Sequence, residues 1–288
     1  MSFVLLGILN SQAAGASAIA YRLQTLGGAG FDAGESVAID SANNLYVFGY
    51  TDSAGAGSRD FLLAKYNSSG AIQWQRVLGG GTFDFGQSVA IDSADNVYVL
   101  GYTSSEGAGG YDFLLAKYDS SGSIQWQRVL GGASSDRGQS VAIDSADNVY
   151  VLGYTSSEGA GSFDFLFAKY NSSGTIQWQR VLGGANFESG ESIAIDSGNN
   201  LYVFGRTSST ALGDTDFLLG ALPNNGSLTG TYVLNGVNIT YAVSSLTAAT
   251  ASLTATTSSL TAGTASLTDA ASSLTSSSVS LTEHRVDL

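Results

Sequence analysis

The fold is decided by the tetrapeptide VAID at residues 37–40, because this motif returns along the chain at a fixed interval. Its later copies lie at 89–92, 141–144 and, as IAID, 193–196, so each begins 52 residues after the last without insertion. A fixed period of this length is typical of arrays in which one supersecondary unit buries its apolar faces against its neighbours. The chain therefore contains four repeats, and we expect its function to be built around them.

Each repeat contains four strand-like runs, which in the first copy are 36–41, 44–51, 60–66 and 72–78. The runs are rich in Val, Ile, Leu, Tyr and Phe, and clusters of Gly, Ser, Asn and Asp separate them. In the second run the residues of both faces are apolar, so each sheet must lie between two others. Four short strands per unit predict an all-β fold, a small β-propeller with one repeat per blade. A flat solenoid or a stack of hairpins are the alternatives.

The motifs of the second repeat also resemble a known family. They are LGG (78–80), DFG (84–86), VAIDS (89–93), NVYV (96–99), GYT (101–103), DFLLAKY (112–118) and SG (121–122). Their order and spacing, kept through residues 20–236, are similar to those of the bacterial β-propeller repeat called SBBP. The resemblance implies a propeller that serves as a scaffold or binding surface, and it implies no reaction.

The closure of the propeller is open at this stage. The motif of the fourth strand occurs five times, at 21–28, 73–80, 125–132, 177–184 and 229–236, whereas the other three strands occur four times. Either residues 21–26 complete the last blade and 229–234 lead into the tail, or the array stays open and another subunit covers its edge. Of these, we expect a small closed ring.

The charge and the residue inventory exclude several classes of function. The formal net charge is −13 with only 11 Lys and Arg, so the chain would repel nucleic acid. There is no Cys, and the single His, His284, lies far from the repeats, so they contain no Ser-His-Asp or Cys-His centre. We predict that the protein is not an enzyme and uses no cofactor and no metal.

Acidic residues recur at three positions of the repeat, which are Asp32, Asp84, Asp136 and Glu188; Asp40, Asp92, Asp144 and Asp196; and Asp60, Asp112, Asp164 and Asp216. A catalytic site is normally single, whereas these positions are fourfold. We interpret them as caps of turns, with calcium binding and carboxylate catalysis as the alternatives.

The triplet Trp-Gln-Arg at 74–76, 126–128 and 178–180 places an aromatic ring and a guanidinium on one face of a strand. We expect cation–π packing at the blade edge, with sugar stacking as the alternative. Loops that vary on a rigid scaffold are better candidates for a unique site. The candidate contact residues in these loops are Phe83, Phe85, Tyr111 and Phe163.

The tail, residues 237–288, has a different pattern, in which Leu recurs every seven residues among Ser, Thr and Ala. These leucines are Leu246, Leu253, Leu260, Leu267, Leu274 and Leu281. On one flat strand they would alternate between faces, whereas on a supercoiled helix they form one stripe. We expect an α-helical coiled-coil stalk that joins chains into a homotrimer. A β-structured shaft is the rival, because Thr and Ser also suit strands.

The first 19 residues contain an apolar run at 3–9, too short to span a bilayer, followed by small residues at 13–18. We expect an uncleaved docking segment, with a signal peptide as the alternative because 16–18 fit a cleavage site. The first 15 residues also resemble the start of structural proteins of marine bacteriophages.

These regions together predict an elongated assembly protein. The leading hypothesis is a bacteriophage virion component, either a tail fibre or a capsid-attached fibre. It would contact other virion proteins through residues 1–19 and a host-surface glycan or protein through its propeller loops. A secreted adhesin of the bacterial surface, or a carbohydrate-binding propeller, is the alternative.

Overall fold

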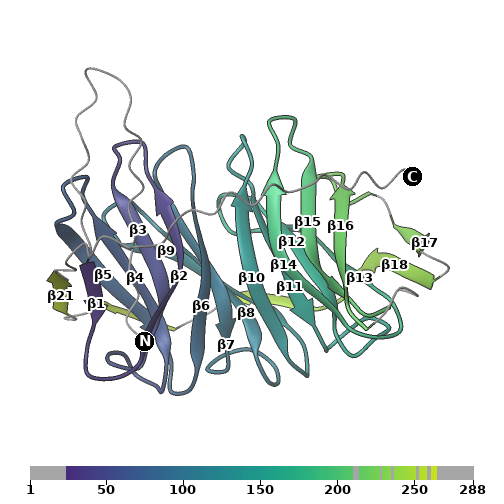
Figure 1. Ribbon diagram of the computed structural model, residues 1–288, viewed down its shortest axis with the longest axis horizontal. Helices are drawn as coiled ribbons and strands as arrows, with labels where there is room; N and C mark the ends of the chain where they lie inside the picture. Colours follow the sequence, from purple (N-terminus) through teal and green to yellow (C-terminus); the bar gives the residue numbers. More distant parts are fainter. Residues whose placement is uncertain are drawn as a thin grey trace, which may run out of the picture.

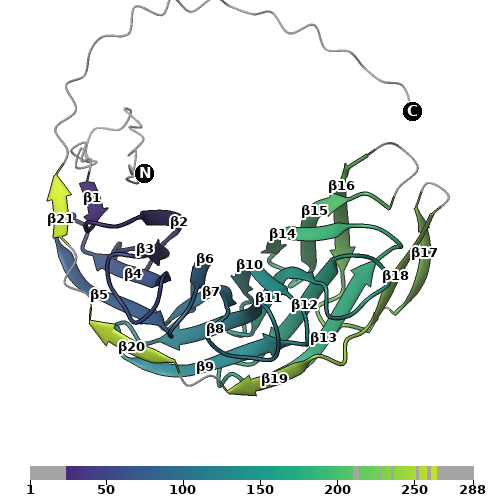
Figure 2. The same cartoon turned by 90° about the horizontal axis from the view of Figure 1, so that it is seen from below.

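The computed structural model describes residues 24–209, 214–227, 229–234, 237–250, 253–257 and 261–264. Within these ranges all regular secondary structure is β, and no helix long and apolar enough to cross a membrane is present. Four blades stand side by side in an open arc (Figures 1 and 2). The first strand of each blade lines the concave side of the arc, and the fourth strand lies on the convex side (Figure 2).

The blades follow the four repeats. Blade 1 contains β2 (Asp32–Ile39), β3 (Leu45–Thr51), β4 (Asp60–Tyr66) and β5 (Ile72–Gly79). Blade 2 contains β6 (Asp84–Ile91), β7 (Val97–Thr103), β8 (Asp112–Tyr118) and β9 (Ile124–Gly131). Blade 3 contains β10 (Asp136–Ile143), β11 (Val149–Thr155), β12 (Asp164–Tyr170) and β13 (Ile176–Gly183). Blade 4 contains β14 (Glu188–Ile195), β15 (Leu201–Thr207) and β16 (Asp216–Leu222), and its sheet consists of these three among the described strands.

The remaining strands flank the blades. They are β1 (Gln24–Gly27), β17 (Gly230–Leu234), β18 (Val237–Val243), β19 (Thr247–Thr250), β20 (Thr254–Thr257) and β21 (Thr261–Thr264). In blades 1 to 3 the predicted strands match those observed to within two residues, except that the first strand begins at Asp32 rather than at residue 36. A bulge between Gly34 and Ser36 separates the early part from the rest, and the low β-propensity of Asp, Ala and Gly hides it in the sequence. The fourth strand predicted for the last repeat does not join blade 4, because β17 pairs with β18.

The core lies between consecutive blades, where side chains of one blade enter hollows over glycines of the next. Phe48 and Phe61 of blade 1 lie so close to Gly86 and Gly101 of blade 2 that a Cβ at either glycine would approach the phenyl ring to 2.6 or 2.8 Å. Leu100 and Phe113 meet Gly138 and Gly153 in the same way, and Leu152 and Phe165 meet Gly190 and Gly205. At each interface we call the two inserted side chains, such as Phe48 and Phe61, the knob pair, and the two glycines that they contact, such as Gly86 and Gly101, the glycine pair. Their repetition fixes how each blade stacks on the next.

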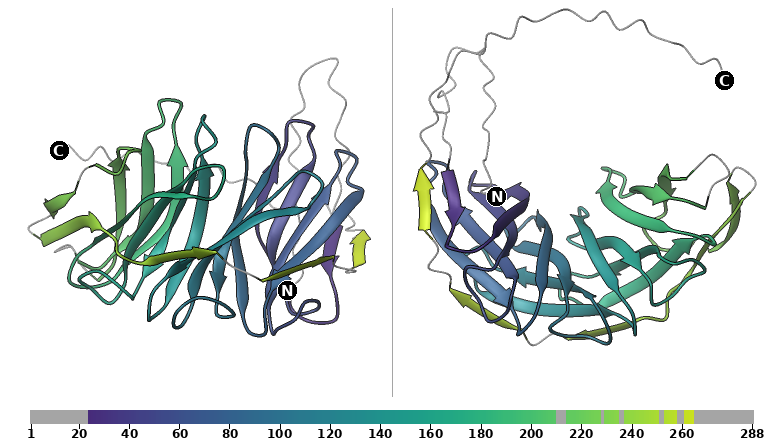
Figure 3. Two further views of the ribbon diagram at one scale, coloured as in Figure 1. Left: turned by 180° about the vertical axis from the view of Figure 1, so that it is seen from behind. Right: turned by 60° about the horizontal axis from the view of Figure 1, so that its bottom comes forward.

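The prediction of a helical stalk is wrong for the described part of the tail, which forms strands. β18 pairs with β13, β19 with β9, β20 with β5 and β21 with β1, so the tail returns along the convex side and adds one strand to each sheet it passes (Figure 3). The period of seven sets the distance from one blade edge to the next, because β19, β20 and β21 begin at 247, 254 and 261. Leu246 and Leu253 lie just before β19 and β20 rather than within one continuous strand, so these two leucines do not alternate between faces.

The structure therefore places the described leucines of the stripe against the protein's own blades. A Cβ at Gly132 would lie 2.9 Å from a methyl group of Leu246, and one at Gly80 would lie 3.0 Å from a methyl group of Leu253. Ile239 holds the same position beside Gly184. The other predicted oligomerisation residues, Leu260, Leu267, Leu274 and Leu281, lie outside the described residues, as does the docking segment 1–19.

The closed ring is also not formed by the described strands. β1 pairs only with β21, and β16 is the last strand of its sheet, so the two ends of the arc stay apart (Figure 2). The open array is therefore the alternative observed among the described strands: 229–234 do lead into the tail, because β17 forms a hairpin with β18, but β1 does not complete blade 4. The repeat period specifies the blade but not the closure of the array.

Candidate functional site

The two edges of the arc differ in chemistry, and we name them separately. The turn rim holds the short turns after the first and third strands of each blade, beginning with 40–44 and 67–71. The loop rim holds the longer loops after the second and fourth strands, beginning with 52–59 and 80–83. Strands of each sheet run antiparallel between the two rims.

On the turn rim the recurring Asp40 position caps a turn, as predicted. Oδ1 of Asp40 accepts hydrogen bonds from the backbone N–H of Ala42 at 3.0 Å and of Asn44 at 2.8 Å. Asn43 between them has a φ of 61°, which the Asx side chain tolerates. Nζ of Lys65 lies 3.3 Å from Oδ2 of Asp40, and that carboxylate is almost fully buried.

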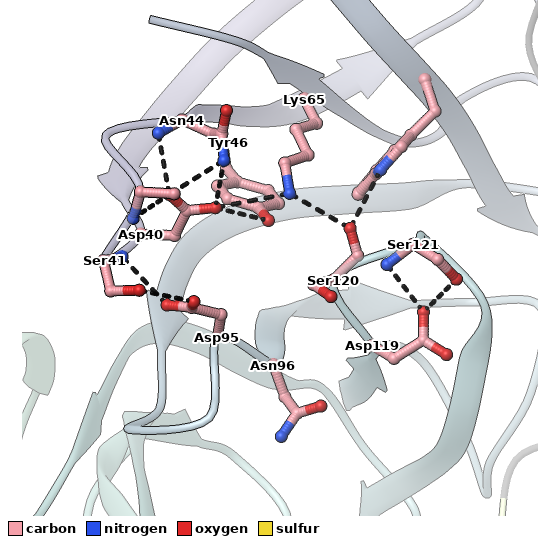
Figure 4. Close-up of polar contacts among 12 residues, drawn as sticks. Asp40, Ser41, Asn44, Tyr46, Lys65, Asp95, Asn96, Asp119, Ser120 and Ser121 are labelled. Carbon is pink, nitrogen blue, oxygen red and sulfur yellow. Dashed lines mark hydrogen bonds and ion pairs between the residues drawn. The ribbon is translucent and has the colours of Figure 1, made fainter.

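The same rim fastens neighbouring blades (Figure 4). The N–H and hydroxyl of Ser41 donate to the carboxylate of Asp95 in blade 2 at 2.9 and 2.7 Å. Nζ of Lys65 and Nε1 of Trp74 both donate to the carbonyl of Ser120, at 3.2 and 3.3 Å. These contacts recur at the next interface, so they belong to the scaffold.

The Trp-Gln-Arg triplets have structural partners. The guanidinium of Arg76 lies 5.2 Å from the Trp74 ring and donates from Nε to the carbonyl of Gly122 at 2.7 Å. The middle residue of the triplet holds the tail, since Nε2 of Gln127 donates to the carbonyl of Leu253 at 2.8 Å. Cation–π packing at the blade edge is thus confirmed, whereas the role of the glutamine was missed.

On the loop rim the recurring Asp60 position is buried. Burial raises the pKa of Asp60 to about 6, that of Asp112 to about 7 and that of Asp164 to about 6. The acid that begins the next blade adds repulsion in each case. Asp84 is one of these acids at the start of the next blade. Its carboxylate accepts hydrogen bonds from the N–H of Gly80 at 2.8 Å and from the hydroxyl of Ser105 at 3.0 Å. Across the described ranges, no three His, Cys, Asp or Glu side chains form a group suited to a metal ion.

Three of the predicted contact residues lie together on the loop rim. The rings of Phe83 and Phe85 are stacked with centroids 6.1 Å apart, and Phe85 meets Tyr111 edge-on at 6.1 Å. The fourth, Phe163, belongs to a second group with Tyr154 at 5.3 Å and Phe187 at 5.7 Å. The variable loops therefore do gather aromatic side chains along one rim.

Sequence reasoning missed the residues that join these rings to one another. Arg59 lies over Phe85, Phe31 and Tyr50 at 5.1, 5.2 and 5.4 Å. Arg137 lies over Tyr111 and Tyr102 at 4.8 and 5.3 Å. We call the whole set the aromatic–arginine band; it consists of Phe31, Tyr50, Arg59, Phe83, Phe85, Tyr102, Tyr111, Arg137, Tyr154, Phe163 and Phe187.

A signal for the band exists in the sequence when the repeats are aligned. Positions 33, 85, 137 and 189 hold Ala, Phe, Arg and Ser, and positions 59, 111, 163 and 215 hold Arg, Tyr, Phe and Thr. Few other positions change chemistry so widely between repeats. The backbone under them is fixed, because the N–H of Asp84 donates to the carbonyl of Arg59 and that of Glu188 to the carbonyl of Phe163, both at 2.8 Å.

The chemistry that the band offers is stacking and positive charge. Phe31 and Phe83 are 38% and 42% exposed, so their faces are open to a ligand. Neither arginine forms an ion pair among the described residues, and Nε of Arg137 is buried without a hydrogen-bond partner there. Rings beside unpaired guanidinium groups suit a ligand that carries both apolar faces and anionic or acceptor oxygens.

The fold defines a class: a β-propeller repeat scaffold, whose loop rim carries aromatic and arginine side chains at positions that vary between repeats. The model of one family, the β-propeller repeat SBBP, matches residues 73–107 and 125–159. These residues run from the fourth strand of one blade into the loop rim of the next. The match supports the interpretation of the chain as an SBBP-type repeat protein.

Two curated proteins are similar over part of their length. The chain is 24% identical over 223 residues to "Uncharacterized WD repeat-containing protein L264" of Acanthamoeba polyphaga mimivirus, a match covering 55% of this chain and 16% of that protein. It is 30% identical over 131 residues to "Regulatory protein FlaEY" of Caulobacter vibrioides, covering 41% of this chain and 13% of that protein. The chain thus corresponds to less than a fifth of either relative.

Proposed function

We propose that the protein is a binding protein that recognises an acidic surface glycan through the aromatic–arginine band. The observation that carries this proposal is the departure of the band from the repeat. The contacts that stack the blades recur at each interface. Equivalent positions on the loop rim, in contrast, hold different side chains in different blades, among them Phe, Tyr and Arg. Such variation on a rigid scaffold is typical of a recognition surface.

The ligand class follows from the contacts. Aromatic faces stack on the apolar faces of sugar rings, and guanidinium groups bind carboxylates in a bidentate fashion. The net charge of −13 makes the chain as a whole repel anions, whereas Arg59 and Arg137, which form no ion pair in the described ranges, give the band a local positive charge. An acidic polysaccharide provides both the rings and the carboxylates.

The setting that we propose is a bacteriophage particle, in which the protein is a tail fibre or capsid-attached fibre. The support is the resemblance of residues 1–15 to marine bacteriophage structural proteins. Mass spectrometry of purified particles tests it: the protein is expected among the virion components. A protein found on the bacterial surface and absent from particles would instead be the secreted adhesin, with the same binding surface and no catalysis.

Binding is tested with the purified full chain on an array of acidic and neutral bacterial polysaccharides. Wild-type protein is expected to bind an acidic member, and Tyr111→Ala and Arg137→Gln are each expected to weaken that binding about tenfold or more. The matched control is Tyr232→Ala, because Tyr232 is an exposed aromatic on β17 outside the band. Equal binding by all four proteins, or no binding to any acidic glycan, would reject the proposal.

A further inference from the structure

The two ends of the arc each hold one half of a blade-to-blade interface. At the blade 4 end, the knob pair is Phe204 and Phe217, and Phe217 is 82% exposed while its counterpart Phe61 in blade 1 is 1% exposed. Leu219 beside it is 72% exposed, against 2% for Leu63. In blades 1, 2 and 3 the next blade covers the side chains at these positions.

The blade 1 end holds the complementary half. Its glycine pair, Gly34 and Gly49, lines an open hollow together with Leu45, Val47 and Leu62. Val37 is 46% exposed there, whereas Val89 at the same position of blade 2 is 7% exposed. In blades 2, 3 and 4 the knob pair of the preceding blade fills this place.

The strand edges are complementary in the same sense. β1 has the sequence position of a fourth strand, and it lies over blade 1 as β5 lies over blade 2. Nε2 of Gln24 donates to the carbonyl of Gly70 at 2.9 Å, just as Arg76 binds Gly122. β1 carries β21 on its outer edge as β5 carries β20. Among the described strands β1 lacks a blade, and blade 4 lacks a fourth strand.

We propose that a second copy of the chain docks head to tail at blade 4. The β1 strand of the second copy pairs with β16, and Phe204 and Phe217 enter the hollow over Gly34 and Gly49 of that copy. The completed sheet then runs β14, β15, β16, β1, β21, with five strands like the sheets of blades 1 and 2. A head-to-tail contact of this kind closes a ring when its rotation permits.

The described strands offer no occupant from the same chain. β17 has the sequence position of the missing fourth strand, but its hairpin with β18 is anchored to β13. β1 of the same chain lies at the far end of the arc (Figure 2). A second copy offers a blade 1 surface that fits the exposed face of blade 4, because the same contacts join blades 1 to 2, 2 to 3 and 3 to 4.

A disulfide test identifies the docking directly, since the chain has no Cys of its own. In blade 1 Leu63 lies opposite Arg76, so in the proposed sheet Leu219 lies opposite Gln24 of the second copy. Leu219→Cys and Gln24→Cys are made in separate chains and mixed under mild oxidation. The mixture is expected to give a cross-linked dimer of one chain of each kind, and neither variant alone is expected to give it. No such heterodimer would overturn the proposal.

The chain carrying both cysteines distinguishes closure within one chain. It is expected to form covalent species of two or more chains; a cross-linked single chain alone would show that the ring closes on itself and would also overturn the proposal. Because cross-linking can be prevented by misfolding, the oligomer is measured independently. Phe217→Glu is expected to weaken assembly about tenfold or more in sedimentation or native mass measurements. Val233→Glu is the matched control, because Val233 is an apolar residue on β17 that is 70% exposed, and this variant is expected to assemble as wild type. A wild-type chain that sediments as a single subunit would likewise reject the docking.

Discussion

The turn rim and the loop rim belong to the same blades, yet they have diverged to different degrees. On the turn rim the bond from Ser41 to Asp95 is repeated from Ser93 to Asp147 and from Ser145 to Asn199. On the loop rim the side chain that precedes the third strand is in turn Arg59, Tyr111, Phe163 and Thr215. Contacts needed at every interface have been kept, and positions that stacking does not need have changed. Divergence between repeats therefore separates scaffold from recognition surface.

The largest effect is expected on the turn rim. Asp92→Ala removes a buried carboxylate that binds Asn96, Tyr98 and Lys117, and it leaves the lysine without its ion pair. The free energy of unfolding is expected to fall by about 2–4 kcal/mol in urea denaturation. Asp196→Ala is the internal control, because this equivalent residue in blade 4 is less buried than Asp92 and its loss should be much smaller. Equal losses would mean that burial of the Asp92 carboxylate adds nothing to the stability that the capped turn provides.

A second substitution tests the tail on the convex side, which neither rim includes. Leu253→Ala removes an almost fully buried side chain of the core between blades 1 and 2 and leaves a cavity beside Gly80. It is expected to cost about 2–3 kcal/mol and to expose the segment after residue 244 to proteolysis. Unchanged protection of the tail would show that the leucine does not anchor it.

The pH dependence of stability separates the rims by sign. Burial raises the pKa of Asp112 on the loop rim to about 7, above its ordinary value of 3.8. Stability from this group is therefore full below about pH 4 and is lost as the pH rises through 7. Burial alone would raise the pKa of Asp92 on the turn rim too, but hydrogen bonds from Asn96 and Tyr98 hold it below the ordinary value. Its contribution is lost as the pH falls below that value.

Urea denaturation from about pH 2 to pH 8 checks both signs, because the contribution of Asp92 is lost only below its ordinary pKa of 3.8. The wild-type chain is expected to be most stable at about pH 4 and to lose stability as the pH rises from there toward 7. Asp112→Asn cannot lose a proton and is expected to remove part of the decline toward pH 8, while it leaves the acid limb unchanged. A decline that is the same in the variant would contradict the assignment.

The sequence predicted what repetition controls. Strands, blades and turn-capping acids such as Asp40 follow from composition and spacing alone, because each copy repeats the same local physics. The prediction of a helix was wrong for the described part of the tail. The period of seven was interpreted as helical, whereas it measures the step from one blade edge to the next. Glycines such as Gly80 and Gly132 that receive its leucines lie far away in the chain, so only the folded structure brings them together.

The candidate site was predicted in part for a related reason. Phe83, Phe85, Tyr111 and Phe163 stood out because they lie in the loops that vary between repeats. Tyr50 and Tyr102 did not, because they belong to the second strand-like run outside those loops, and Arg59 and Arg137 were passed over because their stacking depends on tertiary contacts. Local variation marks a surface, whereas its composition is set by tertiary packing.

The central claim is that the loop rim of blades 1 to 3 binds a ligand through side chains that the scaffold does not require. Its most direct test is the double variant Phe85→Ser and Tyr111→Thr, which gives blade 2 the residues that blade 4 already carries at 189 and 215. Calorimetric titration with the glycan selected on the array is the measurement. We predict that the double variant unfolds at a urea concentration close to that of wild type and binds the glycan with an affinity about a hundredfold lower. Undiminished affinity in a folded double variant would contradict the account.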